Sequence, residues 1–168
     1  MRSLVSTLVT CMLMASSGSV DVLPKVILGT WRIGQPFDTP QPAGLTAKQE
    51  TYIRSLSLRY TADTLTVCGK KLSIQPTKVK ALTDDDFLQS YGFLPKIVGL
   101  QGSSITDVSI HSNDMMNACG EYESPGVHLL LGKNNHVVME VANEYFPLKK
   151  VTPEDSGDMI PITWKMPG

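Results

Sequence analysis

Polar and apolar residues alternate in the middle of the chain and predict a half-buried β-strand. Leu56, Leu58 and Tyr60 alternate with serine and arginine, so one face of this segment is apolar and the other is polar. A turn follows at residues 61–63, and another apolar segment covers residues 65–68. Together these segments predict an antiparallel hairpin.

The clearest element lies closer to the C-terminus. Two nearly continuous apolar runs, residues 127–131 and 137–141, are joined by Gly-Lys-Asn-Asn-His and predict a β-hairpin that either has both faces covered or faces a second sheet. A strand over residues 144–151 contains Pro147, which lacks an N–H and so predicts an edge strand or a bulge. Other extended segments are expected at residues 29–33, 72–82 and 105–110.

Two short helices are expected where a threonine stands three residues before a glutamine or an aspartate. Thr46 with Gln49, and Thr83 with Asp86, have capping-box spacing, and Gly92 supplies a stop for the second helix. The elements add up to seven or eight short strands and one or two short helices, with almost no strand–helix–strand spacing. The predicted fold is mainly β, a single antiparallel barrel or sandwich.

Composition limits both the size of the protein and its partners. With 168 residues, 42% hydrophobic and 18% charged, the chain is expected to form one globular domain with a core. Lysine and arginine number 15, aspartate and glutamate number 16, and the net charge is −1. Because this balance provides no basic field, nucleic acid and anionic membrane surfaces are not expected as partners.

The N-terminus has the pattern of a secretory signal peptide. Arg2 supplies the positive charge, residues 4–14 the apolar run, and residues 15–17 (Ala-Ser-Ser) the small-residue cleavage site. The apolar run is shorter than the ~20 residues that a membrane-spanning helix needs. A lipoprotein anchored at Cys11 is the alternative, because this cysteine follows an apolar triplet.

The expected organisation is a signal peptide at residues 1–19, a β-barrel-like domain at 20–151 and a Pro-rich tail at 152–168. The predicted location is therefore secreted or periplasmic. In such an oxidising compartment, Cys68 and Cys119 are expected to form one disulfide, worth about 4 kcal/mol in the chain-entropy model. A reactive thiol or a metal ligand pair is the alternative, but the close CxxC spacing of such sites is absent.

The sequence offers few groups for catalysis. It contains neither a Gly-x-Ser-x-Gly nor a Ser-x-x-Lys nucleophile motif. His111, His128 and His136 are spaced too irregularly for metal ligands, so no metal or cofactor is expected; His128 is interpreted as half-buried and His136 as exposed. An enzyme is the less favoured hypothesis, and its first general-base candidate is His111 near Asp107 or Asp114.

The acidic run Asp84-Asp85-Asp86 is interpreted as the start of the second helix. Carboxylates there accept unpaired backbone N–H groups and complement the positive end of the helix dipole. A calcium site would need oxygens at alternating positions and a glycine at the turn, and this run has neither.

The segment Leu28-Gly29-Thr30-Trp31, which opens the first predicted strand, resembles the Gly-x-Trp start of lipocalin-like barrels. Segments at residues 29–33, 82–88, 104–108 and 145–149 are similar to those of small exported bacterial β-barrel proteins of unassigned function. The resemblance implies a lipocalin-like barrel and supplies no catalytic residues. The middle helix and the Pro-rich loop after Trp31 depart from a regular eight-stranded lipocalin.

These observations lead to the hypothesis of an exported, non-catalytic binding protein for a small apolar ligand or an envelope component. Eight aromatic residues can either line a cavity or fill the core: Trp31, Tyr52, Tyr60, Phe87, Tyr91, Phe93, Tyr145 and Phe146. The alternative is a periplasmic protein–protein module, such as an inhibitor of a secreted enzyme. Residues 35–45, stiffened by Pro36, Pro40 and Pro42, would then enter the partner.

Overall fold

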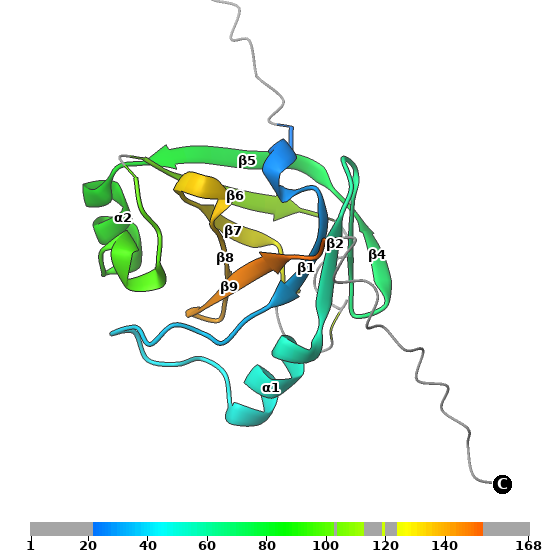
Figure 1. The fold of residues 1–168 in the computed structure, drawn as a ribbon, viewed down its shortest axis with the longest axis horizontal. Coiled ribbons are helices and arrows are strands. Elements are labelled where there is room, and N and C mark those ends of the chain that lie inside the picture. The colour runs from blue at the N-terminus through cyan, green and yellow to red at the C-terminus, as the bar shows by residue number, and fades with distance from the viewer. Residues whose placement is uncertain (1–21, 103, 113–118, 120–123, 153–168) are drawn as a thin grey trace, which may run out of the picture.

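A computed structural model describes residues 22–102, 104–112, 119 and 124–152, so the predicted signal peptide and residues 153–168 of the predicted tail lie outside it. The described part contains one antiparallel sheet and two α-helices (Figure 1), which confirms the mainly β fold. The strands are β1 (Gly29–Ile33), β2 (Ser57–Tyr60), β3 (Thr64–Val67), β4 (Lys70–Ser73), β5 (Gln75–Leu82), β6 (Ile105–His111), β7 (His128–Leu131), β8 (Val137–Val141) and β9 (Glu144–Lys150). The helices are α1 (Ala47–Ser55) and α2 (Asp84–Tyr91).

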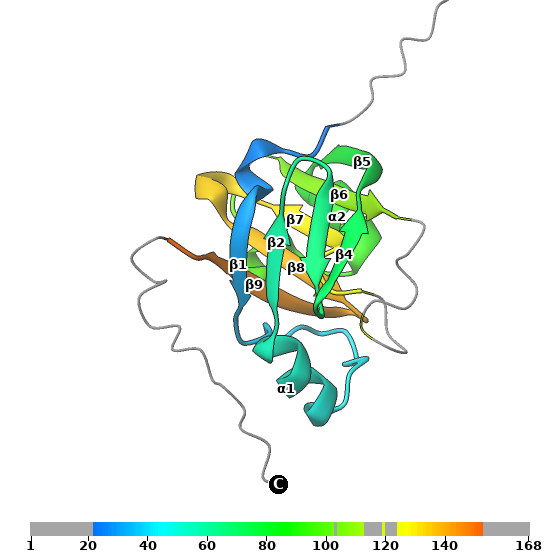
Figure 2. The ribbon, with the colours of Figure 1, turned by 90° about the vertical axis from the view of Figure 1, so that its right-hand side faces the viewer.

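The sheet curls into a half-barrel. Its strand order is β4-β3-β2-β1-β9-β8-β7-β6-β5, so β1 and β9, from opposite ends of the domain, meet in the middle of the sheet. The edge strands β4 and β5 are consecutive in the chain and are separated only by Ile74. One residue can connect two edges only if the sheet bends back on itself, and in Figure 2 β1, β2 and β4 lie in front of β7 and β8.

The single extended segment expected over residues 72–82 is therefore two strands, because the chain passes from one edge of the sheet to the other at Ile74. The register of β5 against β6 shifts between Gln75 and Lys78. Pro76 lies within this irregular stretch of an edge strand, where the missing N–H of a proline is tolerated.

Both helices begin at the capping boxes that the sequence predicts. At α1, the Thr46 hydroxyl accepts the N–H of Gln49, and the Gln49 side chain accepts the N–H of Thr46. Thr83 and Asp86 form the same reciprocal pair at α2, which confirms that the acidic run stands at a helix start. α2 ends at Gly92, whose φ of 76° is left-handed.

The inside of the half-barrel is packed with side chains from the strands on both of its sides. This inner core includes Trp31, Leu58, Met139 and Phe146, each at most 2% exposed. Trp31 and Phe146 thus help to fill the half-barrel, which is one of the two roles that the sequence leaves open for the aromatic residues.

A second core lies on the outer face of the sheet. There Leu130 and Val138 pack with Phe87 of α2, and all three are fully buried. Their strand neighbours Leu129 and Met139 belong to the inner core. Both faces of the β7–β8 hairpin are therefore covered, which is one of the two arrangements that its continuous apolar runs predict.

Two contacts tie the β2–β4 wall to the segment between β6 and β7. The Tyr60 hydroxyl donates to the Gly126 carbonyl at 2.7 Å. Gly126 has a φ of 91°, and a Cβ there would lie 2.5 Å from the Tyr60 oxygen, so the contact requires glycine. Cys68 and Cys119 lie at disulfide distance, with Cα atoms 5.4 Å apart, as their predicted pairing requires.

The position of β9 corrects the edge-strand prediction from Pro147, because β9 is a central strand between β1 and β8. The Gly34 N–H donates to the Pro147 carbonyl at 2.8 Å, immediately after β1 ends at Ile33. The backbone N and the carbonyl of a strand residue point toward the same neighbouring strand. The N of Pro147 therefore faces β1 at the position where the pairing of β1 with β9 ends. A central strand can therefore accommodate this proline without losing a bond inside the ladder.

Candidate functional site

The general-base candidate from the sequence, His111 with Asp107, is wrong. His111 is the last residue of β6 and is exposed, and Asp107 lies four residues earlier on the same strand. Four residues of a strand span roughly 13 Å, too far for a hydrogen bond between the two side chains. Asp114, the other suggested partner, lies outside the described residues.

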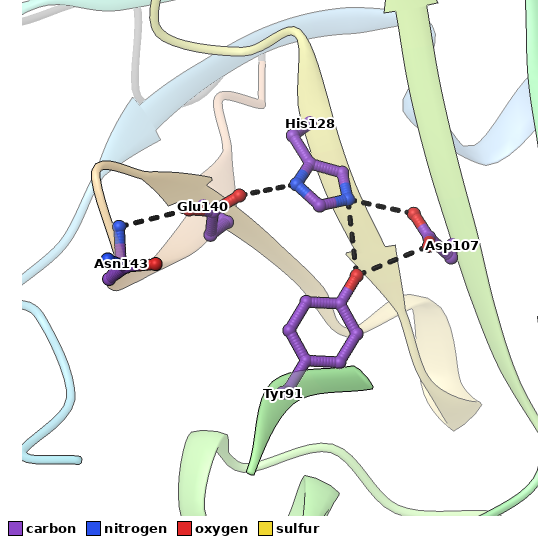
Figure 3. A network of polar contacts seen from close by, with 5 residues as sticks. All are labelled: Tyr91, Asp107, His128, Glu140 and Asn143. Carbon is purple, nitrogen blue, oxygen red and sulfur yellow. Dashed lines mark hydrogen bonds and ion pairs between the residues drawn. The ribbon is translucent and has the colours of Figure 1, made fainter. Parts of the chain in front are cut away.

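Asp107 instead contacts His128, which belongs to a polar network on the outer face of the sheet (Figure 3). Asp107, His128 and Glu140 come from the neighbouring strands β6, β7 and β8. The register pairs Leu129 with Met139, which places His128 beside Glu140. Tyr91, the last residue of α2, reaches the network from the helix that covers this face.

Both ring nitrogens of His128 are engaged. Nδ1 is hydrogen-bonded to Oε2 of Glu140, and Nε2 lies 2.9 Å from Oδ1 of Asp107. The Tyr91 hydroxyl donates to Oδ2 of Asp107 at 3.2 Å and also lies 3.2 Å from Nε2 of His128. The second oxygen of Glu140 accepts the backbone N–H of Asn143 at 3.0 Å.

This arrangement favours the charged forms of His128 and Glu140. Burial on its own would lower the pKa of His128, but the hydrogen bonds and charges of Asp107 and Glu140 outweigh it and raise the pKa to about 10. Burial opposes ionisation of Glu140, yet its bonds to His128 and the Asn143 N–H lower the pKa of this carboxyl. Burial and the charge of Asp107 raise the pKa of Tyr91. At neutral pH the network therefore contains two carboxylates and one imidazolium, an excess of one negative charge.

Such a histidine is unsuited to general-base catalysis, which needs a neutral imidazole with a nitrogen facing the substrate. The network instead fixes the side chains around it. Glu140 is held at both oxygens and the Tyr91 hydroxyl is held at the sheet. The network therefore orients the Glu140 carboxylate and the Tyr91 ring.

These fixed groups border a cleft of about 250 Å³, which we call the tyrosine cleft. It is lined by Gln41, Ser90, Tyr91, Glu140, Asn143 and Tyr145. Gln41 comes from the Pro-rich segment 35–45 and donates its side-chain N–H to the Tyr91 carbonyl at 2.9 Å. The loop predicted from the sequence thus contributes Gln41 to the lining of this cleft.

A larger cleft of about 590 Å³ lies at one end of the half-barrel, and we call it the mouth cleft. It is lined by Lys25, Val26, Trp31, Asn135, Leu148 and Lys150. The ammonium nitrogen of Lys150 stands 5.3 Å from the centre of the Trp31 ring and 3.4 Å from the Val26 carbonyl, to which it donates. Trp31 itself is fixed by donating its ring N–H to the Ile27 carbonyl at 2.6 Å.

His128 and His136 have the exposures that the sequence predicts. His128 is half-buried, and His136 is exposed with Nδ1 3.0 Å from the Gly99 carbonyl. In the described ranges, no group of three or more His, Cys, Asp or Glu residues is arranged to hold a metal ion. None of the helices described is long and apolar enough to cross a membrane.

Comparisons with protein-family models, with curated proteins and with solved structures give no match. The resemblance to lipocalin-like exported proteins therefore stays a prediction. What each cleft can bind follows from its own residues.

Proposed function

We propose that the protein is a non-catalytic binding protein for a small amphipathic anion, a molecule with an apolar body and one carboxylate or phosphate group. The observation that carries this proposal is the composition of the mouth cleft. Its lining combines the apolar side chains of Trp31 and Leu148 with the two lysines Lys25 and Lys150. This combination matches an apolar ligand with a single anionic end.

The lysines retain binding capacity for such an anion. Within the described residues, no carboxylate forms an ion pair with Lys25 or Lys150. An ammonium group has three N–H donors, and Lys150 uses one of them on the Val26 carbonyl. Charge-assisted hydrogen bonds to a carboxylate or phosphate are stronger than those between neutral groups, so the two lysines favour an anionic ligand.

Size and packing also support the mouth cleft as the ligand site. Its volume of about 590 Å³ lies within the ~300–1,000 Å³ typical of small-molecule pockets. Inner-core residues such as Met139 and Phe146 are fully buried against their neighbours. Binding at the mouth requires no displacement of these side chains.

We also propose that the protein acts outside the cytoplasm. The N-terminal pattern of a signal peptide supports this location. So does the Cys68–Cys119 pair at disulfide distance, since such pairs persist mainly in oxidising compartments. Components of the cell envelope would then be accessible ligands.

The test uses decanoate, below its micelle concentration, and the fluorescence of Trp31. The chain has two tryptophans, so Trp164→Phe leaves Trp31 as the only reporter. We expect a saturable change with decanoate and at least tenfold weaker binding of decanol, which lacks the charge. Lys25→Gln with Lys150→Gln should weaken decanoate binding by at least tenfold.

A matched double variant, Lys48→Gln with Lys78→Gln, removes two exposed lysines from α1 and β5 and should bind decanoate like the parent. Equal binding of decanoate and decanol, or equal loss in the two double variants, would refute the proposed site. Native mass spectrometry of protein purified from its own host adds a second readout, because an amphipathic anion should co-purify.

An inhibitor of a secreted enzyme remains the second candidate, and the anchoring of residues 35–45 favours it. The Phe37 N–H donates to the Tyr145 carbonyl at 2.8 Å, and the Leu45 N–H donates to Glu144 at 2.9 Å. Pro40 and Pro42 are exposed between these anchors, as a rigid inhibitory loop requires. If this function is correct, Pro40→Asp with Pro42→Asp should abolish inhibition of the target enzyme without lowering the melting temperature.

A further inference from the structure

The tyrosine cleft contains hydrogen-bond acceptors that the protein itself leaves unused. Tyr145 lines the cleft, and its hydroxyl forms no hydrogen bond with the residues that the structure describes. No buried side-chain oxygen of the described residues lacks a partner, so this hydroxyl is open to solvent in the cleft and can accept a hydrogen bond from a ligand. Tyr145 lies directly opposite Glu140 on the neighbouring strand, so the two side chains project from the same face of the sheet.

Two further acceptors line the same cleft. Gln41 donates its side-chain N–H to the Tyr91 carbonyl, so its amide oxygen is left as an acceptor. Oε1 of Glu140 accepts one bond, from the Asn143 N–H, and a carboxylate oxygen can accept a second. A ligand suited to these atoms is a donor with several N–H groups.

The charge and the aromatic walls indicate that this donor is a cation. The network behind the cleft carries one excess negative charge, and its hydrogen bonds hold Glu140 in place before any ligand arrives. The rings of Tyr91 and Tyr145 stand at 79° to each other with centroids 6.2 Å apart. Where a ring face lies over a bound cation, it adds to the attraction of a nearby carboxylate.

We propose that the tyrosine cleft binds a primary ammonium group carried on an alkyl chain. The three N–H donors of the ammonium match the acceptors of Tyr145, Glu140 and Gln41, and the alkyl chain lies against the tyrosine rings. A volume of about 250 Å³ suits a group the size of a lysine side chain rather than a larger ligand. This chemistry occurs in free alkylamines and in the lysine side chains of peptides.

The test is an NMR titration of the ¹⁵N-labelled full-length protein with n-butylammonium at neutral pH and low salt. We expect saturable shifts of the amide signals of Glu140, Asn143 and Tyr145. Butanol, which lacks the charge, and tetramethylammonium, which lacks N–H groups, should each bind at least tenfold more weakly. Equal binding of either compound would overturn the proposal, as would an absence of saturable shifts at these amides.

The key variant is Tyr145→Phe, which keeps the ring and removes the hydroxyl. Because that hydroxyl has no partner among the described residues, we expect an unchanged fold and at least fivefold weaker binding of n-butylammonium. Tyr52→Phe, on the exposed face of α1, is the matched control and should bind like the parent. If Tyr145→Phe binds n-butylammonium as tightly as the parent, the proposed role of the hydroxyl is overturned. The amide signals of residues away from the cleft report whether the fold of the variant is intact.

A second pair of compounds distinguishes the two sources of the ammonium group. N-acetyl-lysine methylamide represents a peptide and N-acetyl-norleucine methylamide is its uncharged counterpart. Tighter binding of the lysine compound than of n-butylammonium indicates a peptide partner, whereas weaker binding indicates a free amine. Norleucine binding as tight as lysine binding would overturn the proposal. This site shares no lining residue with the mouth cleft, so failure of either proposal leaves the other intact.

Discussion

Replacing His128 by glutamine should make the free energy of unfolding depend less on pH in the alkaline range. In the folded protein the pKa of His128 is raised from its ordinary value of 6.5 to about 10, because the bonds and charges of Asp107 and Glu140 outweigh burial. A raised pKa means that the stabilisation is fully present below pH ~6.5 and is lost as the pH rises through about 10. Glutamine carries no titrating proton and cannot contribute this loss.

The magnitude follows from the size of the pKa change. Each unit corresponds to about 1.4 kcal/mol, so the whole shift is worth about 5 kcal/mol. Only 21% of the His128 side chain is exposed, and solvent screens these ion pairs incompletely. Burial and the charge of Glu140 raise the pKa of nearby Tyr145 to about 12, so this tyrosine stays neutral while His128 titrates.

The assay is urea unfolding at several pH values between 6 and 10. The parent protein should lose about 1.4 kcal/mol of unfolding free energy per pH unit over this interval, and His128→Gln should lose much less. His111→Gln, which changes an exposed histidine at the end of β6, is the matched control and should follow the parent. Parallel curves for the parent and His128→Gln would show that the network does not hold the histidine in its charged form.

Three further predictions concern stability. Cys68→Ala with Cys119→Ala should lower the unfolding free energy by about 4 kcal/mol under oxidising conditions, and a melting temperature equal to that of the parent would show that no bridge contributes. Tyr60→Phe should cost about 1–2 kcal/mol in urea unfolding because a buried carbonyl loses its donor, while the exposed Tyr52→Phe should cost almost nothing. Thr83→Ala should cost about 1 kcal/mol, measured the same way, by removing the N-cap of α2; no change would mean that the capping box is not formed.

Local sequence patterns predicted most of the elements because their signals lie within a few residues. The runs around residues 127–141 predicted the β7–β8 hairpin, and the threonine spacings predicted where both helices begin. Pro147 misled the prediction because its effect depends on which strand lies beside it. That neighbour is β1, from the other end of the domain, and no local pattern shows where β1 stops.

The polar network was missed because its members lie on three strands and one helix. Each of Asp107, His128 and Glu140 is the one ionisable residue in a short, mainly apolar or hydroxyl-bearing segment, and that was the available signal. His128 and Glu140 also stand at equal distances from Asn134, the centre of the hairpin turn, so the hairpin register alone would have paired them. The contacts of Asp107 and Tyr91 need the tertiary fold and could not be predicted in this way.

The pairing of β1 with β9 has a consequence for how the chain is made. During synthesis β1 leaves the ribosome early, while its partner β9 follows only after the other strands. Until then β1 presents an unpaired edge that can pair with a second copy or another nascent chain. The β2–β4 hairpins and the β5–β8 strands can form in sequence, but β1 and β8 are bridged in the sheet only when β9 pairs with both of them. A chain that stops before β9 should therefore aggregate through the unpaired edge of β1.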